Sequence, residues 1–145
     1  MKAAIERHLG EKLVRIEEAL GELTCEVKAA YLLEAARMCR EEEELHFEFL
    51  SDLTGIDAGG GRYEVVYHLL SIKHRRRLRL KVKLAEAEEV DSVVGIWPTA
   101  DWHERESYDM VGIVFKGHPG LERILTPEGF EGHPLRKGYP LRGEE

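Results

Sequence analysis

The sequence predicts an α+β fold, a two-layer sandwich in which helices cover one face of a mainly antiparallel sheet, with an extended irregular C-terminal arm. Three observations lead to this prediction. Two central segments alternate apolar and polar residues, other segments space their apolar residues as helices do, and all five prolines lie at or beyond Pro98. Alternation is typical of half-buried strands, and a 3.6-residue period is typical of helices. We therefore expect a domain over residues 1–125 and an arm over residues 126–145.

Two helices and one strand are expected in the N-terminal part. Residues 5–13 have helical character that Gly10 interrupts, and residues 23–27 alternate as a strand does. The next helix is expected over residues 29–42, where the apolar side chains share one face and an acidic run closes the helix toward solvent.

The clearest pattern is an antiparallel hairpin formed by residues 63–69 and 78–84, which both alternate with a period of two. Residues 73–76 are its expected turn. A basic row follows the polar side of the second strand and consists of Arg75, Arg77, Arg79, Lys81 and Lys83. Such a row is most often the solvent-facing side of a strand. Binding of phosphate or lipid headgroups and contact with an acidic neighbouring protein are the alternatives.

A further strand is expected over residues 47–53, and a loop over residues 54–62, where three glycines follow one another at positions 59–61. The loop has neither the G-x-x-x-x-G-K-[ST] pattern of a phosphate-binding loop nor the G-x-G-x-x-G pattern of a dinucleotide site. We interpret it as a flexible connection.

A last helix is expected from near Asp101, where Asp101 and Glu104 match a capping box, to Gly112, a residue type that commonly ends helices. A short strand over residues 113–115 should follow. The arm carries three prolines and four glycines, which nearly exclude regular structure. Its apolar residues are Phe130, Leu135, Tyr139 and Leu141. These are too many for a freely solvated tail, so we expect the arm to dock on a partner.

Composition excludes several function classes. The 145 residues suit one domain with one core, and the net charge of −7 argues against nucleic acid as a partner, because phosphate binding requires a basic surface. No apolar run approaches the ~18 residues that span a bilayer. Cys25 and Cys39 are the only cysteines and are expected to be reduced and partly buried. Two thiols cannot supply the four ligands of an ordinary iron–sulfur cluster.

A small metal-dependent hydrolase is the rival from another class. His103 and Glu104 begin like the zinc motif H-E-x-x-H, but Ser107 stands at its fifth position. The remaining candidate ligands are His118, Glu131 and His133. Nothing in their spacing brings them together, and the sequence has no G-x-S-x-G nucleophile.

The expected helix that ends at Gly112 should have a narrow apolar arc and a broad charged one. Its charged residues are Asp101, Glu104, Arg105, Glu106 and Asp109. Arg105 lies four residues from both Asp101 and Asp109, a spacing that allows a ladder of ion pairs. Trp102 falls within the charged arc, where it either packs under the arm or anchors an interface with a partner.

Several of these residues together resemble a known family. Glu104-Arg105-Glu106, then Asp109, Met110-Val111, His118 and Ile124-Leu125 closely resemble the signature of the 30 kDa subunit family of respiratory complex I. Residues 129–137 are similar to the C-terminal stretch of that family, and residues 50–57 and 67–70 also match it. The resemblance covers residues 45–141, with departures at Glu122 and Gly138.

The resemblance implies a cofactor-free peripheral-arm subunit of a proton-pumping NADH:quinone oxidoreductase. The subunit would pack against the large quinone-site subunit and adjacent cluster-bearing subunits in a hetero-oligomer, on the cytoplasmic side of the cell membrane. It would have no catalytic residues, and flavin and iron–sulfur clusters would belong to partner subunits. An equivalent subunit of a membrane-bound hydrogenase or related oxidoreductase is the alternative within the family.

The partner interface predicted on this basis lies on the helix that ends at Gly112 and on the arm. Its residues are Trp102, Glu104, Arg105, Glu106, Asp109, His118, Phe130, His133, Leu135, Arg136 and Tyr139.

Overall fold

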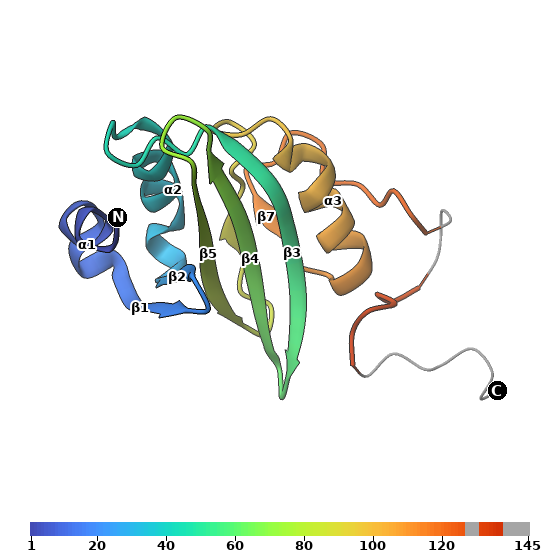
Figure 1. The fold of residues 1–145 in the computed structure, drawn as a ribbon. Coiled ribbons are helices and arrows are strands. Elements are labelled where there is room, and N and C mark those ends of the chain that lie inside the picture. Colours follow the sequence, from blue (N-terminus) through green and yellow to red (C-terminus); the bar gives the residue numbers. More distant parts are fainter. Residues whose placement is uncertain (127–130, 138–145) are drawn as a thin grey trace.

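A computed structural model describes residues 1–126 and 131–137 of the protein and has a five-stranded mixed sheet at its centre (Figure 1). The strands are β1 (Leu13–Ala19), β2 (Glu22–Val27), β3 (Phe49–Gly59), β4 (Arg62–Ser71) and β5 (Arg76–Ala85). Their order across the sheet is β1-β2-β5-β4-β3, and only the β2–β5 pair is parallel. The predicted α+β class with a mainly antiparallel sheet is confirmed.

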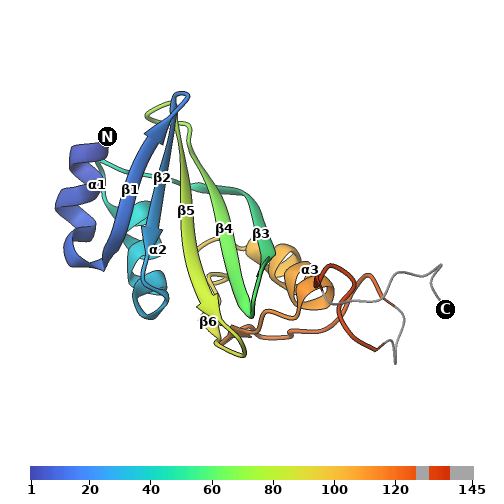
Figure 2. The ribbon, with the colours of Figure 1, turned by 90° about the horizontal axis from the view of Figure 1, so that it is seen from below.

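Three helices accompany the sheet: α1 (Lys2–Leu9), α2 (Leu32–Glu41) and α3 (Ala100–Val111). Short 3-10 turns at Gly10–Lys12 and Ala29–Tyr31 follow α1 and precede α2, respectively. A separate parallel pair, β6 (Val90–Asp91) and β7 (Phe115–Lys116), lies beyond β5. Figure 2 shows α1 and α2 beside β1 and β2, with α3 at the opposite edge next to β3.

The core lies between the helices and one face of the sheet. Inward-pointing residues of the central hairpin are Tyr63, Val65, Tyr67, Leu69, Leu78, Leu80, Val82 and Leu84, all of which are buried. The register pairs Tyr63 with Leu84 and Leu69 with Leu78, as the period-two pattern predicts. The hairpin and its turn are therefore confirmed. Because alternate residues point to opposite faces, the basic row lies on the face away from this core.

The predicted loop over residues 54–62 is wrong, because β3 continues to Gly59 and pairs with β4 along its whole length. Only Gly60 and Gly61 form the turn, and Gly59, Gly60 and Gly61 all have positive φ angles of 63–89°. Glycine adopts such angles without steric cost, so three glycines make a tight hairpin turn here. Strand β1 was not predicted, because it is an edge strand whose residues are all exposed or half-buried and show no clear alternation.

Helix α3 begins differently from the prediction. Its N-cap is Thr99, no side chain caps its first turn, and Glu104 is buried elsewhere, so the predicted capping box is wrong. Its end is as predicted: Gly112 has a φ of 88° and donates to the carbonyls of Ser107 and Tyr108. The strand expected over residues 113–115 is shorter and shifted, at Phe115–Lys116.

Helix α3 crosses the outer edge of the sheet at Gly55 of β3. The amide of Gly55 donates to Ser107 Oγ at 3.1 Å, so the helix satisfies a backbone group of the edge strand. A Cβ atom at Gly55 would lie 2.8 Å from Ile113 Cδ1 and 3.1 Å from Ser107 Cβ. The absence of a side chain at residue 55 therefore sets how closely α3 approaches β3.

We expect Gly55→Ala to lower the free energy of unfolding by about 1–3 kcal/mol, because the new methyl group overpacks this contact. The measurement is urea unfolding followed by tryptophan fluorescence. Gly95→Ala is the matched control, since nothing lies within 4 Å of a Cβ there. Equal unfolding free energies for the two variants would contradict the proposed contact.

Candidate functional site

The carboxylate of Asp109 holds the segment that follows β7 against the end of α3. Its side chain is fully buried and accepts hydrogen bonds from the backbone amides of Ile124, Leu125 and Thr126 at 2.6–3.0 Å. The Thr126 hydroxyl and the Arg123 guanidinium donate to its other oxygen, each at 2.6 Å. One buried acid thus organises four consecutive residues that belong to no helix or strand.

This environment keeps Asp109 charged. Burial alone raises the pKa of a carboxyl, but here donors from Thr126, Arg123 and the Leu125 amide outweigh it and hold the pKa of Asp109 well below its ordinary value. A buried carboxylate with this many donors is stable only while all of them stay in place.

The last carbonyls of α3 are capped by the arm. His133 Nδ1 lies 2.8 Å from the Asp109 carbonyl and therefore carries the proton in this bond. The Leu135 amide donates to the Met110 carbonyl at 2.7 Å, and Arg136 Nε donates to the Val111 carbonyl at 2.5 Å. These carbonyls have no partner within a helix, and cationic donors are favoured at a helix C-terminus.

The arm also reaches the hairpin turn of β3 and β4. The guanidinium of Arg136 lies 5.2 Å from the ring of Tyr63, and the Lys137 amide donates to Asp57 Oδ2 at 2.8 Å. Residues 131–137 are therefore attached to the domain by backbone and side-chain contacts. We call the end of α3 with residues 123–126 and 131–137 the arm junction.

Two further predicted site residues anchor α3 within the protein. Glu104 is fully buried and accepts from Ser92 Oγ at 2.6 Å and from the Val93 amide at 2.8 Å. The side chain of His118 is almost fully covered, accepts the Gly120 amide at Nδ1 and lies 3.0 Å from Asp101 Oδ1 through Nε2. All these partners belong to the same polypeptide.

The predicted charged arc of α3 is therefore wrong for Glu104 and Asp109, which point inward. The predicted ion-pair ladder is also wrong: Asp101 pairs with His118, Asp109 pairs with Arg123, and Arg105 forms no ion pair with either acid. Among the described residues, Arg105 Nε has one long contact, 3.5 Å, with the Glu122 carbonyl. Helical spacing indicated local partners, whereas the real partners lie 14 and 17 residues along the sequence.

Apolar side chains remain exposed around the arm junction. Trp102 is 50% exposed, Leu125 50% and Leu135 63%, and Glu106 is half-buried. The structure thus leaves Trp102 largely uncovered by the described residues. Phe130 and Tyr139, which the sequence also places at the interface, lie outside the described residues.

No group of three or more potential metal ligands is found in the part of the protein that the structure describes. His118, Glu131 and His133 do not form a group of three side chains able to hold a metal ion there. Among the same residues, no helix is both long and apolar enough to cross a membrane.

Comparison with known proteins identifies the family. Residues 25–145 match the family described as the 30 kDa subunit of respiratory-chain NADH dehydrogenase. The chain belongs to this family. The resemblance seen in the sequence is thereby confirmed. The match begins at Cys25, so it includes the second half of β2 and all of α2 as well as the segment from residue 45 onward that carries the sequence motifs.

Two relatives align with nearly the whole of this chain. The C subunit of NADH-quinone oxidoreductase from Roseiflexus castenholzii is 47% identical over 146 aligned positions, which cover 99% of this chain and 84% of the relative. The corresponding C subunit from Ralstonia pickettii is 46% identical, with 99% of this chain and 76% of the relative covered.

One solved structure shares the fold. A polypeptide of the membrane-bound sulfane sulfur reductase, an archaeal respiratory membrane complex, superposes with a TM-score of 0.82 over 98% of this chain and 86% of its own length. Its sequence identity is 20%, so this similarity establishes the fold alone.

Sequence reasoning missed Arg123 and Thr126, which complete the arm junction. Neither residue stands at a helical spacing from Asp109. The one signal in the sequence is a carboxylate next to Met110 and Val111 at the apolar end of a helix, where a charge needs donors from elsewhere.

We expect Asp109→Asn to lower the free energy of unfolding by about 3–5 kcal/mol at neutral pH, because Arg123 loses its buried counter-charge and the amide group faces other donors. Urea unfolding measures this effect. Glu106→Gln, on the same helix, is the control and should change stability by less than about 0.5 kcal/mol.

The effect of Asp109→Asn should depend on pH. Because the folded-state pKa of Asp109 is depressed, its contribution is full above the unfolded value of about 3.9 and is lost as the pH falls toward the folded value. The difference between wild type and variant should therefore persist down to about pH 4 and shrink below it. A difference that stays constant down to pH 2 would contradict the role of the charge.

Proposed function

We propose that the protein is the cofactor-free 30 kDa-type subunit of a proton-pumping NADH:quinone oxidoreductase and that it packs against the large subunit of the quinone site. The relatives at 46–47% identity are named as the C subunits of NADH-quinone oxidoreductases, which supports the assignment. The observation that carries the docking proposal is the arm junction, where the buried carboxylate of Asp109 holds an irregular segment with exposed apolar side chains.

Docking at the arm junction should lose little conformational entropy, because the contacting backbone is already held in place. Leu125 and Leu135 project from backbone whose amides are already bonded to Asp109 and Met110. Binding costs less when the contacting groups are held in place beforehand. Trp102 lies on the exposed side of α3 and is the type of large side chain that dominates interface energies.

The predicted interface residues then divide into two roles. Trp102, Arg105, Glu106 and Leu135 are proposed to contact the partner directly. Glu104, Asp109, His118, His133 and Arg136 are proposed to act from within the protein, by fixing α3 and the arm. Phe130 and Tyr139 remain proposed contacts of the arm.

In this proposal the subunit sits on the cytoplasmic side of the cell membrane and is attached through its partners in a hetero-oligomer. Adjacent subunits carry the flavin and the iron–sulfur clusters through which electrons pass from NADH. The protein contributes contacts to the enzyme and no reacting group of its own. The hydrogenase-type alternative is not favoured, since the relatives at 46–47% identity are NADH-quinone oxidoreductase subunits.

We expect Trp102→Ala to reduce the yield of intact complex from native membranes by about 30-fold, the effect of losing an anchor that contributes roughly 2 kcal/mol. The free protein should keep its unfolding free energy within about 0.5 kcal/mol, because half of the side chain is exposed. Native gel electrophoresis measures assembly, and urea unfolding of the free protein measures stability.

Leu20→Ala is the matched control, because Leu20 is a fully exposed apolar residue between β1 and β2. Figure 2 shows these two strands on the other side of the sheet from α3. Complexes that contain the Trp102 variant should reduce quinone at the normal rate per particle. Full assembly with abolished quinone reduction would show a direct catalytic role and contradict the proposal.

We also expect the purified protein to be colourless and free of metal. Burial raises the pKa of the Cys25 thiol to about 12 and raises that of Cys39 as well, so neither forms the thiolate that binds clusters. Absorption spectroscopy and elemental analysis test this expectation. A flavin or iron–sulfur band in the refolded protein, or stoichiometric zinc, would refute it.

A further inference from the structure

A row of basic side chains lies on the face of the sheet opposite the helices, although the protein as a whole carries a net charge of −7. Arg77, Arg79, Lys81 and Lys83 occupy alternate positions of β5 and point away from the core, because Leu78, Leu80, Val82 and Leu84 between them are buried. Strand β5 is central in the sheet, with β2 and β4 on either side. The basic row therefore does not protect a sheet edge, which is the usual role of such charges.

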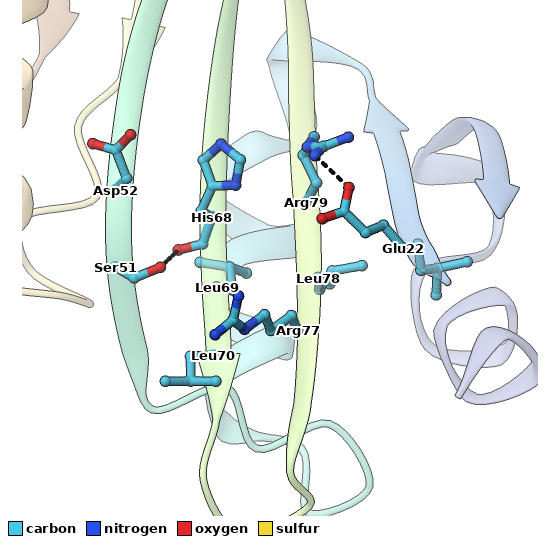
Figure 3. Close-up of a pocket in the computed structure, with 10 residues that line it drawn as sticks. Glu22, Ser51, Asp52, His68, Leu69, Leu70, Arg77, Leu78 and Arg79 are labelled. Atoms are coloured by element: carbon cyan, nitrogen blue, oxygen red, sulfur yellow. Dashed lines mark hydrogen bonds and ion pairs between the residues drawn. The ribbon is translucent and has the colours of Figure 1, made fainter. Parts of the chain in front are cut away.

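A groove of about 400 Å³ crosses this open face (Figure 3). Its polar lining comes from four strands and consists of Glu22, Ser51, Asp52, His68, Arg77 and Arg79. The register sets His68 of β4 beside Arg79 of β5 and Asp52 of β3, and it sets Leu70 beside Arg77. Figure 3 shows His68 and Arg79 side by side in the groove.

Only part of the basic row is neutralised within the protein. Arg79 pairs with Glu22 at 2.7 Å, and Lys83 lies 3.5 Å from Glu26. Arg77 and Lys81 form no ion pair with any described residue, and Arg77 is exposed. Arg77 lines the groove and Lys81 lies further along the same side of β5, so two cations of this face are available to carboxylates from another molecule.

Apolar side chains flank the groove on the other side. Phe49 of β3 is 48% exposed and stands in the same cross-strand row as Leu70 and Arg77. Further along β3, Ile56 is 40% exposed. Strands β3 and β5 are two strand spacings apart, about 10 Å, which is close to the width of one helix. A single polypeptide segment therefore reaches the apolar side and the basic side together.

We propose that this face docks an acidic segment of a neighbouring polypeptide, which lies along the groove with carboxylates on Arg77 and on Lys81 beside the groove, and with apolar side chains on Phe49. A lipid surface fits less well, since the groove is concave whereas a bilayer surface is flat. The surface is separate from the arm junction, and the proposal rests on the proposed function only in taking the neighbour to be another subunit.

The test uses the intact complex from native membranes and a carbodiimide, which joins a lysine amine to a carboxylate in direct contact. We expect cross-links from Lys81 to an aspartate or glutamate of another subunit. Arg77→Glu should reduce their yield roughly tenfold, since a repulsive charge then faces the segment. Arg37→Glu is the control, because Arg37 is an exposed cation on α2. In this variant the yield of cross-links from Lys81 should be unchanged.

Acylation of Lys81 by a succinimidyl ester, compared between free protein and complex, gives the second readout. Equal rates in the two, or cross-links confined to Glu26 of the same polypeptide, would overturn the proposal. So would protection produced by phosphatidylglycerol vesicles added to the free protein, which would identify a membrane surface. Suppose that Trp102→Ala prevents assembly, but Lys81 is acylated as fast in the wild-type complex as in the free protein. The proposed function would then stand, and only this docking surface would be refuted.

Discussion

The buried carboxylate of Asp109 is the interaction on which the functional part of the structure depends. It lies in the last turn of α3, where the helix dipole disfavours negative charge, so its stability there has to come from other groups. This stabilisation comes from three consecutive backbone amides, one hydroxyl and the Arg123 guanidinium, which all donate hydrogen bonds to the carboxylate. Because backbone amides make up most of these donors, the carboxylate fixes the course of the backbone after β7 as well as the position of a side chain.

The end of α3 and the arm stabilise each other. The helix presents unpaired carbonyls and a carboxylate, and the arm presents amides and cationic donors that lack partners of their own in any helix or strand. Arg123 joins the two halves of the junction, since it donates to Asp109 and also to the Gly132 carbonyl at 2.6 Å. Residues 123–126 and 131–137 are held here without regular secondary structure, because these backbone groups have specific partners.

The elements that local patterns could predict are those whose partners are close in sequence. The β4–β5 hairpin, α2 and the glycine end of α3 all follow from periodicity or from one residue type. Residues 54–59 were predicted as a loop because the three glycines at 59–61 indicate a turn, yet they pair with β4 as a strand. Glu104 was placed on the exposed side of the helix, yet it is buried because Ser92 and Val93, 12 and 11 residues earlier, donate to it. Hydrophobic periodicity treats a carboxylate as a solvent-facing residue, so it cannot reveal an acid that has buried donors.

Glu104 and Asp109 show why burial alone does not decide what an acid does. Both side chains are fully buried on the same helix, yet burial raises the pKa of Glu104, whereas the pKa of Asp109 is depressed. Glu104 has two donors and no cation within ion-pair distance among the described residues, while Asp109 has five donors and one of them is charged. Ionisation of Glu104 therefore opposes folding as the pH rises through its raised pKa, and ionisation of Asp109 supports folding. Of the two acids, Asp109 attaches α3 to the arm through its charge. Glu104 attaches α3 to the residues that follow β6, and its two hydrogen bonds only partly offset the free energy lost by burying its carboxyl group.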